Sequence, residues 1–424
     1  MAQLTDDCFA FSGPLLPVDD LEQIIRERVT PVAEIETVAL ALARGRTLAR
    51  DIQAPIDLPP FDNSAVDGYA VRHADLSAQS DTALTVADRI TAGRAAAHPI
   101  APGTAIRIFT GAPMPEGADT VFMQEDVRTE GGSVIVPPGL KQGSNRRLAG
   151  EDIRAGSVAL PAGRVLSIAD VALAAALGLT ALPVRRRIRV ALFSTGDELI
   201  EPGQPLARAS LYDANRTLLG GLIAALGAIV TDLGILPDDP AILAPALRDA
   251  AGGHDLVLTS GGVSTGEADH VRDAVEAVGK LVFWRVAIKP GRPVAMGVIP
   301  GASAESSAAF VGLPGNPVAA FVTFVRVVRP LIMRLAGADA PALVPLPVRA
   351  GFAYRKKLGR REYVRVNLTR DADGAIVAVK HRQEGAGVLT SLTETGGLVE
   401  LPENATTVEP GSTVGFLPYA SLVS

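Results

Sequence analysis

The chain has 424 residues, of which 48% are hydrophobic and 20% charged, and its formal net charge at pH 7 is −6. This composition predicts a globular protein of about three domains, and the acidic balance argues against a nucleic-acid partner, because phosphate backbones bind basic surfaces. The single cysteine, Cys8, excludes a disulfide framework and cysteine-based metal sites. We expect a soluble, cytoplasmic protein without a membrane partner, because the N-terminus has no signal-peptide pattern and the longest apolar stretches are broken by Gly or Pro.

The first half of the chain predicts helices around a β-rich segment. Apolar residues recur at helical spacing over residues 17–46, in two runs that Pro31 interrupts. Residues 80–146 alternate short strand patterns with Pro-Gly and Gly-Gly turns, which predicts a β-rich insert. Residues 168–178 are apolar on almost every side, which predicts a buried helix.

From residue 185 to 330, apolar strand patterns alternate with helical ones, which is typical of a mostly parallel, doubly wound sheet with helices on both faces. The expected strands are 188–193, 228–236, 256–259, 281–288 and 309–312, and the expected helices are 215–226, 240–251, 269–278 and 317–335. From about residue 337, short alternating strands return and predict a small β-barrel or sandwich.

The strongest local feature is TSGGVSTGEAD, from Thr259 to Asp269, between a buried strand and a helix. Backbone N–H groups of a Gly-rich turn can hold an anion at the carboxyl end of a strand. Glu267 and Asp269 add oxygen atoms that suit a divalent cation beside a phosphate. An ordinary turn with solvated acids is the alternative.

Three more strand ends carry polar groups. Asp197 and Glu198 follow the strand 188–193, and the rigid sequence KPGRP offers Lys289 and Arg292 as ligands for a phosphate or another oxyanion. In GLPGNP, Asn316 and the following proline form a favourable helix start that could also hold an anion. For each of these segments a purely structural role stays open.

A hydrolase is a further alternative, because Gly262-Val-Ser264-Thr-Gly266 matches the G-x-S-x-G nucleophile elbow. Asp273 and His381 follow in the required order. However, His381 falls in the β-rich C-terminal region, and no HGGG-type oxyanion segment is present. The sequence also lacks GxGxxG and GxxxxGK[ST], which disfavours a dinucleotide-binding fold and a P-loop ATPase.

Two polar segments lie outside the sheet region. PPFDNSAVDGY contains Asp62 and Asp67, and NRRLAGED contains Arg147 and Asp152. Thr110 ends a predicted strand beside a Pro-Gly turn. Each segment taken alone could equally be a turn or a surface salt-bridge cluster.

In order, the segments PPFDNSAVDGYAV, FTGAPMPEGAD, NRRLAGEDI, STGDEL, TSGGVSTGEAD, VAIKPGRPVAMG and GLPGNPVAAFVTF resemble the molybdopterin molybdenumtransferase family, called MoeA in bacteria and represented by the E domain of gephyrin in animals. The resemblance implies a multidomain α/β chain built around a molybdopterin-binding fold. The implied domains are an elongated mixed α/β domain (1–50 and 147–184), a β-rich insert (51–146), the molybdopterin-binding domain (185–330) and a C-terminal β-barrel (337–424).

The resemblance also implies the reaction: molybdenum from molybdate enters adenylylated molybdopterin with the help of Mg²⁺, and AMP and molybdenum cofactor are released. The active site would lie between the molybdopterin-binding domain of one subunit and the insert of the other subunit of a homodimer. The adenylylating enzyme and the recipient molybdoenzymes are the implied protein partners.

The site residues that the resemblance implies fall into three groups. The catalytic set is Asp67, Asp152, Glu198 and Asp269, and the metal set is Glu198, Asp238 and Asp269. The substrate-binding set is Thr110, Arg147, Ser260, Gly261, Gly262, Ser264, Gly266, Lys289, Arg292, Pro314, Asn316 and Ser391. Of these, Asp67, Thr110, Arg147 and Asp152 would come from the partner subunit.

Three alternatives to this function are an adenylyltransferase, a scaffold protein and a tungsten-handling enzyme. The extra domains argue against the first, and the complete set of charged motif positions argues against a scaffold that has lost catalysis. Tungstate and molybdate are nearly equal in size and charge, so the sequence leaves that choice open.

Overall fold

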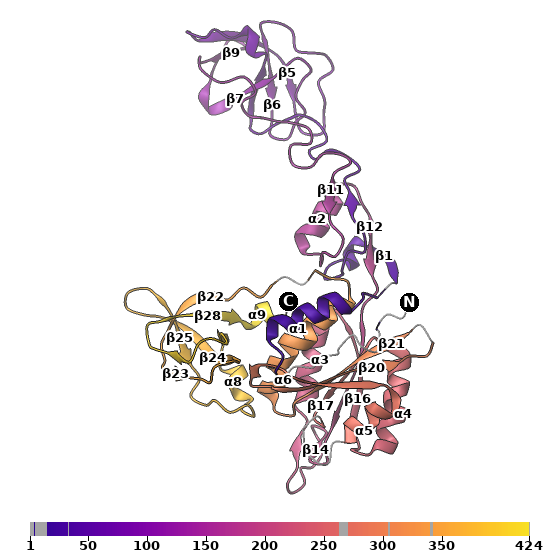
Figure 1. The fold of residues 1–424 in the computed structure, drawn as a ribbon. Helices are drawn as coiled ribbons and strands as arrows, with labels where there is room; N and C mark the ends of the chain where they lie inside the picture. Colours follow the sequence, from indigo (N-terminus) through magenta and orange to yellow (C-terminus); the bar gives the residue numbers. More distant parts are fainter. Residues whose placement is uncertain are drawn as a thin grey trace.

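The structure is a computed structural model that describes residue 4 and residues 15–32, 34–262, 270–303, 306–339 and 342–423. Figure 1 shows an elongated arrangement in which a β-rich insert stands at one end of the chain, joined by a narrow connection to a larger body. The body holds a six-stranded sheet with its helices, and the C-terminal barrel lies beside it. The predicted multidomain α/β fold with a β-rich insert and a C-terminal barrel is confirmed.

Helix α1 (Val18–Arg28) is the first of the two helical runs predicted over residues 17–46. Its acidic first turn and basic last turn both suit the helix dipole, and Val18, Leu21 and Ile25 form its buried face. The second predicted run is wrong, because residues Ile35–Ala39 form strand β1, followed only by the short 3₁₀ turn η1 (Leu40–Leu42). Strand β1 pairs antiparallel with β12 (Ala181–Arg185), and this pairing overrides the weak helical spacing.

Helix α2 (Ile168–Ala176) belongs to the mixed region that connects the insert to the body. Ser167 and Asp170 form a capping box at its start. The prediction of a buried helix is wrong for the single chain: only Asp170 and Ala174 are buried, and Ile168 is 67% exposed. The helix has too few neighbours in this slender region to cover its apolar surface.

The insert is a curled six-stranded sheet with the order β7-β4-β6-β5-β9-β8. The chain enters and leaves it side by side, since β2 (Ile52–Gln53) pairs with β11 (Val158–Leu160) and Leu58 bridges to Ile153. Apolar clusters pack on both faces of the sheet. Its strands are β4 (Gly68–Val71), β5 (Thr82–Ile90), β6 (Thr104–Ile108), β7 (Thr120–Met123), β8 (Arg128–Glu130) and β9 (Ser133–Val136).

The central sheet of the body has the order β16-β13-β17-β21-β20-β18. The first four strands are parallel, and β20 runs against both its neighbours. The sequence prediction missed β20 and read β18 and the separate β19 as one strand. The strands are β13 (Arg189–Thr195), β16 (Ile229–Leu236), β17 (Leu256–Ser260), β18 (Lys280–Arg285), β19 (Ile288–Lys289), β20 (Pro293–Pro300) and β21 (Ser307–Leu313).

Helices cover both faces of this sheet, as predicted. One apolar core joins the sheet to α1 and to residues of α3 and α6–α7, and a second joins it to α4 and α5. The helices are α3 (Asn215–Ala225), α4 (Pro240–Gly253), α5 (His270–Val278), α6 (Pro317–Thr323) and α7 (Arg329–Leu335), with the π-helical turn η4 (Phe324–Val328) between the last two. No helix in the described ranges is both long and apolar enough to cross a bilayer.

The C-terminal region is a closed five-stranded barrel, because β24 pairs with β25 on one side and with β26 on the other. This result confirms the predicted small barrel. Strand β19 of the preceding region adds to the barrel by pairing in parallel with β24. The barrel strands are β22 (Leu346–Ala350), β24 (Arg361–Arg370), β25 (Ile376–Lys380), β26 (Gly397–Leu401) and β28 (Thr413–Pro418).

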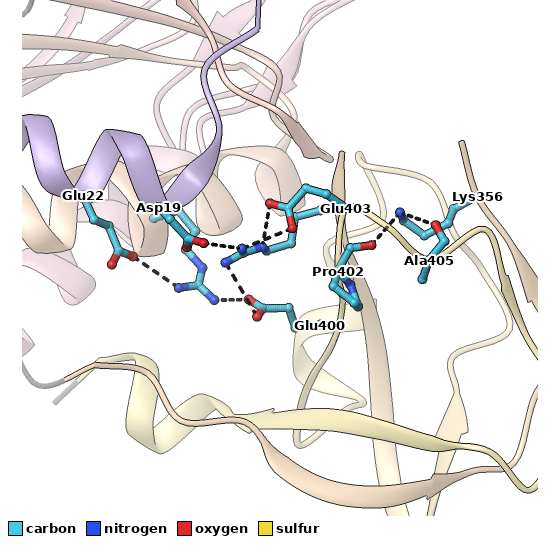
Figure 2. A network of polar contacts seen from close by, with 9 residues as sticks. Asp19, Glu22, Lys356, Glu400, Pro402, Glu403 and Ala405 are labelled. Atoms are coloured by element: carbon cyan, nitrogen blue, oxygen red, sulfur yellow. Dashed lines mark hydrogen bonds and ion pairs between the residues drawn. The ribbon is translucent and has the colours of Figure 1, made fainter. Parts of the chain in front are cut away.

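A network of ion pairs fixes the barrel to the body (Figure 2). Arg326 on η4 contacts both Glu22 of α1 and Glu400 of β26, and its side chain is only 5% exposed. Arg361 of β24 reaches Asp19 of α1 at 3.1 Å and Glu403 of the barrel at 3.0 Å. Two arginines thus tie α1, the end of the sheet domain and the barrel together.

Candidate active site

The turn after β17 needs residues without side chains. Gly261 has φ +90°, and a Cβ there would lie 2.5 Å from the carbonyl oxygen of Thr195 on the neighbouring strand. Gly262 has φ +64°, and a Cβ there would lie 2.4 Å from the Val271 side chain and 2.7 Å from the Thr195 side chain. Only glycine therefore lets the ends of β13 and β17 approach each other here. Ser264, Gly266 and Asp269 lie outside the described residues.

Asn215, at the start of α3, holds the ends of two strands together. Its Nδ2 donates to the Ser260 hydroxyl at 2.8 Å and to the Gly315 carbonyl oxygen at 2.7 Å. Both Asn215 and Ser260 are buried. The sequence prediction missed Asn215, because its partners lie 45 and 100 residues away along the chain. The four-residue stretch YDAN, which precedes a predicted helix, was the only local signal.

The loop after β21 lies at the same edge of the sheet. Pro314 is half-buried, and Asn316 is exposed at the N-cap position of α6, as predicted. Its side chain makes no capping hydrogen bond to the helix. The Asn316 amide is therefore not committed to capping α6.

Carboxylates gather at the ends of β13 and β16. Glu198 folds back over Gly196, where a Cβ would lie 2.7 Å from Glu198 Oε2. Burial raises the pKa of the Asp238 carboxyl, and the charges of Asp197 and Glu198 raise it further against the opposing charge of His270. Asp238 Oδ1 is buried without a hydrogen-bond partner among the described residues. Asp197, Glu198 and Asp238 thus form an acidic cluster beside the Gly261 turn, which we call the Asp238 cluster.

A cation would fit this cluster in chemical terms, since hard divalent ions prefer carboxylate oxygens and Asp238 Oδ1 has no hydrogen-bond partner within the described ranges. Glu198 and Asp238 are the described members of the predicted metal set. Within the described ranges, no three His, Cys, Asp or Glu side chains come close enough to hold a metal ion. Asp269, the third predicted ligand, is among the residues that are not described.

Lys289 lines a cavity of about 170 Å³ between the KPGRP segment and the barrel. Its Nζ lies 3.3 Å from Glu362 Oε2 and 3.4 Å from the Tyr354 hydroxyl. Arg365 and Lys380 of the barrel line the same cavity, together with Glu384, which forms an ion pair with Lys380, so the lining holds more basic than acidic side chains. The predicted partner of Lys289, Arg292, is exposed outside the cavity lining.

Ser391 is fully buried in the barrel and does not line this cavity. Its hydroxyl donates to the Val388 carbonyl oxygen at 2.6 Å and accepts from Arg365 Nε at 3.0 Å. Ser391 thus holds Arg365, which reaches the cavity in its place. Sequence reasoning missed Arg365, because the local pattern of β24 is that of an ordinary barrel strand.

The insert brings together a second set of predicted residues. Asp67 Oδ1 accepts hydrogen bonds from the backbone N–H and from the hydroxyl of Thr110, both at 2.8 Å. The N–H of Thr110, followed by its hydroxyl, lowers the pKa of the Asp67 carboxyl. Strands β3 (Asn63–Ser64) and β10 (Arg146–Arg147) pair next to this site and so join the two polar segments of the insert.

Arg147 and Asp152 lie on the surface of that joined segment. Arg147 is exposed and forms an ion pair with Glu151, and the exposed Asp152 follows directly. Figure 1 shows that the insert and the carboxyl edge of the central sheet lie at opposite ends of one chain. A single chain therefore does not bring all the predicted residues together.

The hydrolase alternative finds no support in the barrel. Both ring nitrogens of His381 are engaged, one with the Gln383 carbonyl oxygen at 3.1 Å and the other with Glu394 Oε2 at 2.9 Å. His381 therefore forms no pair with Asp273 on α5.

Known proteins resemble the chain over nearly its whole length. Family models match it at residues 16–178 (MoeA N-terminal region, domains I and II), 191–334 (probable molybdopterin binding domain) and 347–419 (MoeA C-terminal region, domain IV). A relative from Haemophilus influenzae named molybdopterin molybdenumtransferase is 37% identical and covers 96% of this chain and 100% of its own. One of the same name from Nostoc is 37% identical over 95% of this chain and 93% of its own.

Solved structures agree with this relationship. The molybdopterin biosynthesis MoeA protein of Pyrococcus horikoshii OT3 superposes with a TM-score of 0.79 and 30% identity, covering 96% of this chain and 100% of its own. Together with the glycine turn and the carboxylates at the sheet edge, these matches lead to one conclusion. The chain belongs to the molybdopterin molybdenumtransferase (MoeA) family of transferases.

Proposed function

We propose that this chain inserts molybdenum from molybdate into adenylylated molybdopterin, with the help of Mg²⁺, and releases AMP and molybdenum cofactor. The observation that carries the proposal is the carboxyl edge of the central sheet. There the glycine turn at Gly261 and Gly262 lies between the Asp238 cluster and the loop at Asn316. This edge combines a Gly-rich turn, of the kind that can hold a phosphate, with carboxylates for a cation.

The glycine turn supports phosphate binding through its position, because it ends a buried strand at the edge of the sheet where ligands of α/β folds bind. The N–H of Gly261 itself is engaged with the Leu313 carbonyl oxygen at 3.0 Å. The Gly261 N–H therefore shapes the turn. The groups that bind phosphate would be the Ser260 hydroxyl and polar groups of the sequence that follows Gly262. Asn215 would orient that hydroxyl by donating to it.

Glu198 and Asp238 would hold Mg²⁺, together with Asp269. When bound, Mg²⁺ would neutralise phosphate charge and polarise the bond to be cleaved. The chain's own contribution is to keep a carboxylate oxygen, Asp238 Oδ1, buried at the site without a hydrogen-bond partner among the described residues. Because burial, and after it the like charges of Asp197 and Glu198, raise the pKa of Asp238, a bound cation would favour its ionised form.

Molybdate would bind in the basic cavity at Lys289. The cavity of about 170 Å³ has room for a small anion, and its wall offers Lys289 and Arg365, whose N–H groups suit an oxyanion. Ser391 would act there by holding Arg365. The cavity lies where the sheet domain meets the barrel, so both regions would contribute to binding.

A homodimer would complete the site. The Asp67–Thr110 pair of the insert lies far from the sheet edge in the same chain, as Figure 1 shows. A partner subunit would bring its insert to that edge and supply Asp67, Thr110, Arg147 and Asp152. The exposed apolar residues of the slender region, such as Ile168 and Leu42, support burial against a second copy.

The test of the reaction is AMP release from adenylylated molybdopterin with Mg²⁺, in the presence and absence of molybdate or tungstate. We expect release that depends on the oxyanion and molybdenum gain in the pterin product. Intact substrate binding without AMP release would contradict the transferase and favour a carrier or scaffold.

The test of the shared site is subunit mixing. Asp67→Asn and Glu198→Gln chains should each be inactive alone. Mixed, they should recover about a quarter of wild-type activity, because about half of the dimers are mixed and each of these has one complete site. Mixed dimers without recovered activity would contradict the shared site.

A further inference from the structure

Two arginines face each other on neighbouring strands of the insert. Arg89 of β5 and Arg107 of β6 are paired residues in the parallel register of these strands. Like charges at opposed positions of a sheet repel each other and destabilise the pairing. This placement therefore destabilises the sheet, unless another interaction offsets the repulsion.

Aromatic rings supply part of that compensation. The guanidinium of Arg89 lies 4.9 Å from the ring centre of Phe109, and that of Arg107 lies 5.0 Å from the same ring. Arg107 also lies 4.9 Å from the ring centre of Tyr69, which is its register partner on β4. Such contacts orient the two planar cations without neutralising them.

Carboxylates do not neutralise them either. Within the described part of the chain, neither guanidinium forms an ion pair, and Arg107 donates only to the uncharged Gly68 carbonyl and Gln124 amide oxygens. Three of the four other arginines of the insert do pair with aspartates, at 3.8 Å or less: Arg72, Arg128 and Arg146. Residues 51–146 hold 12 acidic and 7 basic side chains, so two unpaired arginines at one position are a local exception on an acidic domain.

The pair lies beside the insert's half of the proposed site. Phe109, which contacts both guanidiniums, is followed directly by Thr110, whose N–H and hydroxyl bind Asp67. The charge of Arg107 acts on the Asp67 carboxyl and favours its ionised form. The arginine pair and the Asp67–Thr110 pair are thus parts of one polar surface.

We infer that Arg89 and Arg107 form an anion-binding pair that takes a phosphate-type oxyanion of the substrate at the insert. The inference rests on the proposed function and adds to it a binding site outside the predicted set. Guanidinium groups suit this ligand because several N–H donors of each remain free to bind oxygen atoms. The oxyanion could be a substrate phosphate or molybdate, which share this chemistry.

Steady-state kinetics on the full-length protein separate these sources. Arg107→Gln should raise the KM for adenylylated molybdopterin on the order of 10-fold, the usual effect of losing a charged hydrogen bond, with kcat little changed. Arg89→Gln should raise it several-fold. A rise confined to the KM for molybdate would support the pair with molybdate as its ligand.

Two further variants control for charge and folding. Arg128→Gln removes the same charge from another strand of the insert and should leave both KM values unchanged. Arg107→Lys keeps the charge but loses the planar fork, so its KM should lie between wild type and Arg107→Gln. The inference is overturned if both glutamine variants at positions 89 and 107, folded as judged by circular dichroism, match Arg128→Gln in both KM values.

Calorimetric titration with pyrophosphate and with molybdate separates this inference from the proposed function, because it needs no turnover. Weaker binding of either anion by Arg107→Gln than by wild type would support the pair even in a chain that releases no AMP. Equal binding of both anions by the two proteins, with AMP release intact in wild type, would overturn the pair alone.

Discussion

Replacing Arg326 by methionine should loosen the barrel from the body. The side chain of Arg326 is 5% exposed, pairs with Glu22 and Glu400, and lies 5.4 Å from the ring centre of Tyr363. Removing one partner of a buried ion pair costs about 3–5 kcal/mol, because the other charge is left behind. Here Arg361 stays 3.8 Å from Glu400, and the Glu22 side chain is 34% exposed. Since Arg361 and solvent partly compensate the two carboxylates, we expect the free energy of unfolding to fall by about 2–3 kcal/mol.

Thermal unfolding measures this loss, and hydrogen exchange of the β24 and β26 amides locates it. We expect the melting temperature of the barrel to fall by about 8–24 °C, because about 1 kcal/mol shifts a domain of 60–100 residues by about 4–8 °C. Arg349→Met is the matched control, since Arg349 also pairs with two carboxylates of the barrel but is 37% exposed. Its effect should stay below about 1 kcal/mol.

A double-mutant cycle tests the cause. In Arg326→Met/Glu400→Gln no buried charge remains unpaired at this contact, so the double variant should be less destabilised than the sum of the singles. The reasoning is refuted if Arg326→Met is no less stable than Arg349→Met, or if the effects of the two substitutions simply add.

The remaining predictions concern the site and one helix cap. Thr110→Val removes one donor to Asp67 and so raises its pKa; the acid limb of the pH–activity profile should shift to higher pH, and an unchanged limb would contradict the role of the hydroxyl. Gly261→Ala should cost more stability than Gly139→Ala, because both have a positive φ that costs alanine about 1–2 kcal/mol but only Gly261 also clashes with its neighbours. Equal falls in the melting temperatures of Gly261→Ala and Gly139→Ala would contradict the role of the clash. Asp170→Asn should cost about 1 kcal/mol near pH 7. Accepted hydrogen bonds lower the pKa of Asp170 despite its burial, so its contribution to stability is present above pH 3.8 and is lost as the pH falls through the lowered pKa. The melting temperatures of wild type and Asp170→Asn should therefore converge at low pH.

Much of the body could be predicted because its elements are set by local patterns. Buried parallel strands such as β13 and β17 are mostly continuous apolar runs, and β24 of the barrel alternates apolar and polar residues from Val364 to Thr369. Strand β20 was missed because it begins and ends at prolines, which look like turn residues. The run 281–288 concealed the break between β18 and β19, since the chain changes sheets there without a change in hydropathy.

The candidate site was predictable where the polar residues follow strands. The parallel order β16-β13-β17-β21 brings Asp238, Glu198, Gly261 and Asn316 to one edge, as strand-end reasoning expects. Asn215 and Arg365 were not predictable, because each acts through contacts between segments far apart in the sequence. Tertiary contact, and not local pattern, determines their roles.

The chain enters and leaves the insert through one pair of short strands, and this arrangement has a mechanical consequence. The ribbon of β2 and β11 is only two to three residues long in each strand, and the whole insert stands beyond it (Figure 1). A small bend of this ribbon swings the insert as a rigid lever, and the displacement grows with distance from the pivot. The proposed catalytic centre between two subunits would then open and close while each half keeps its internal geometry.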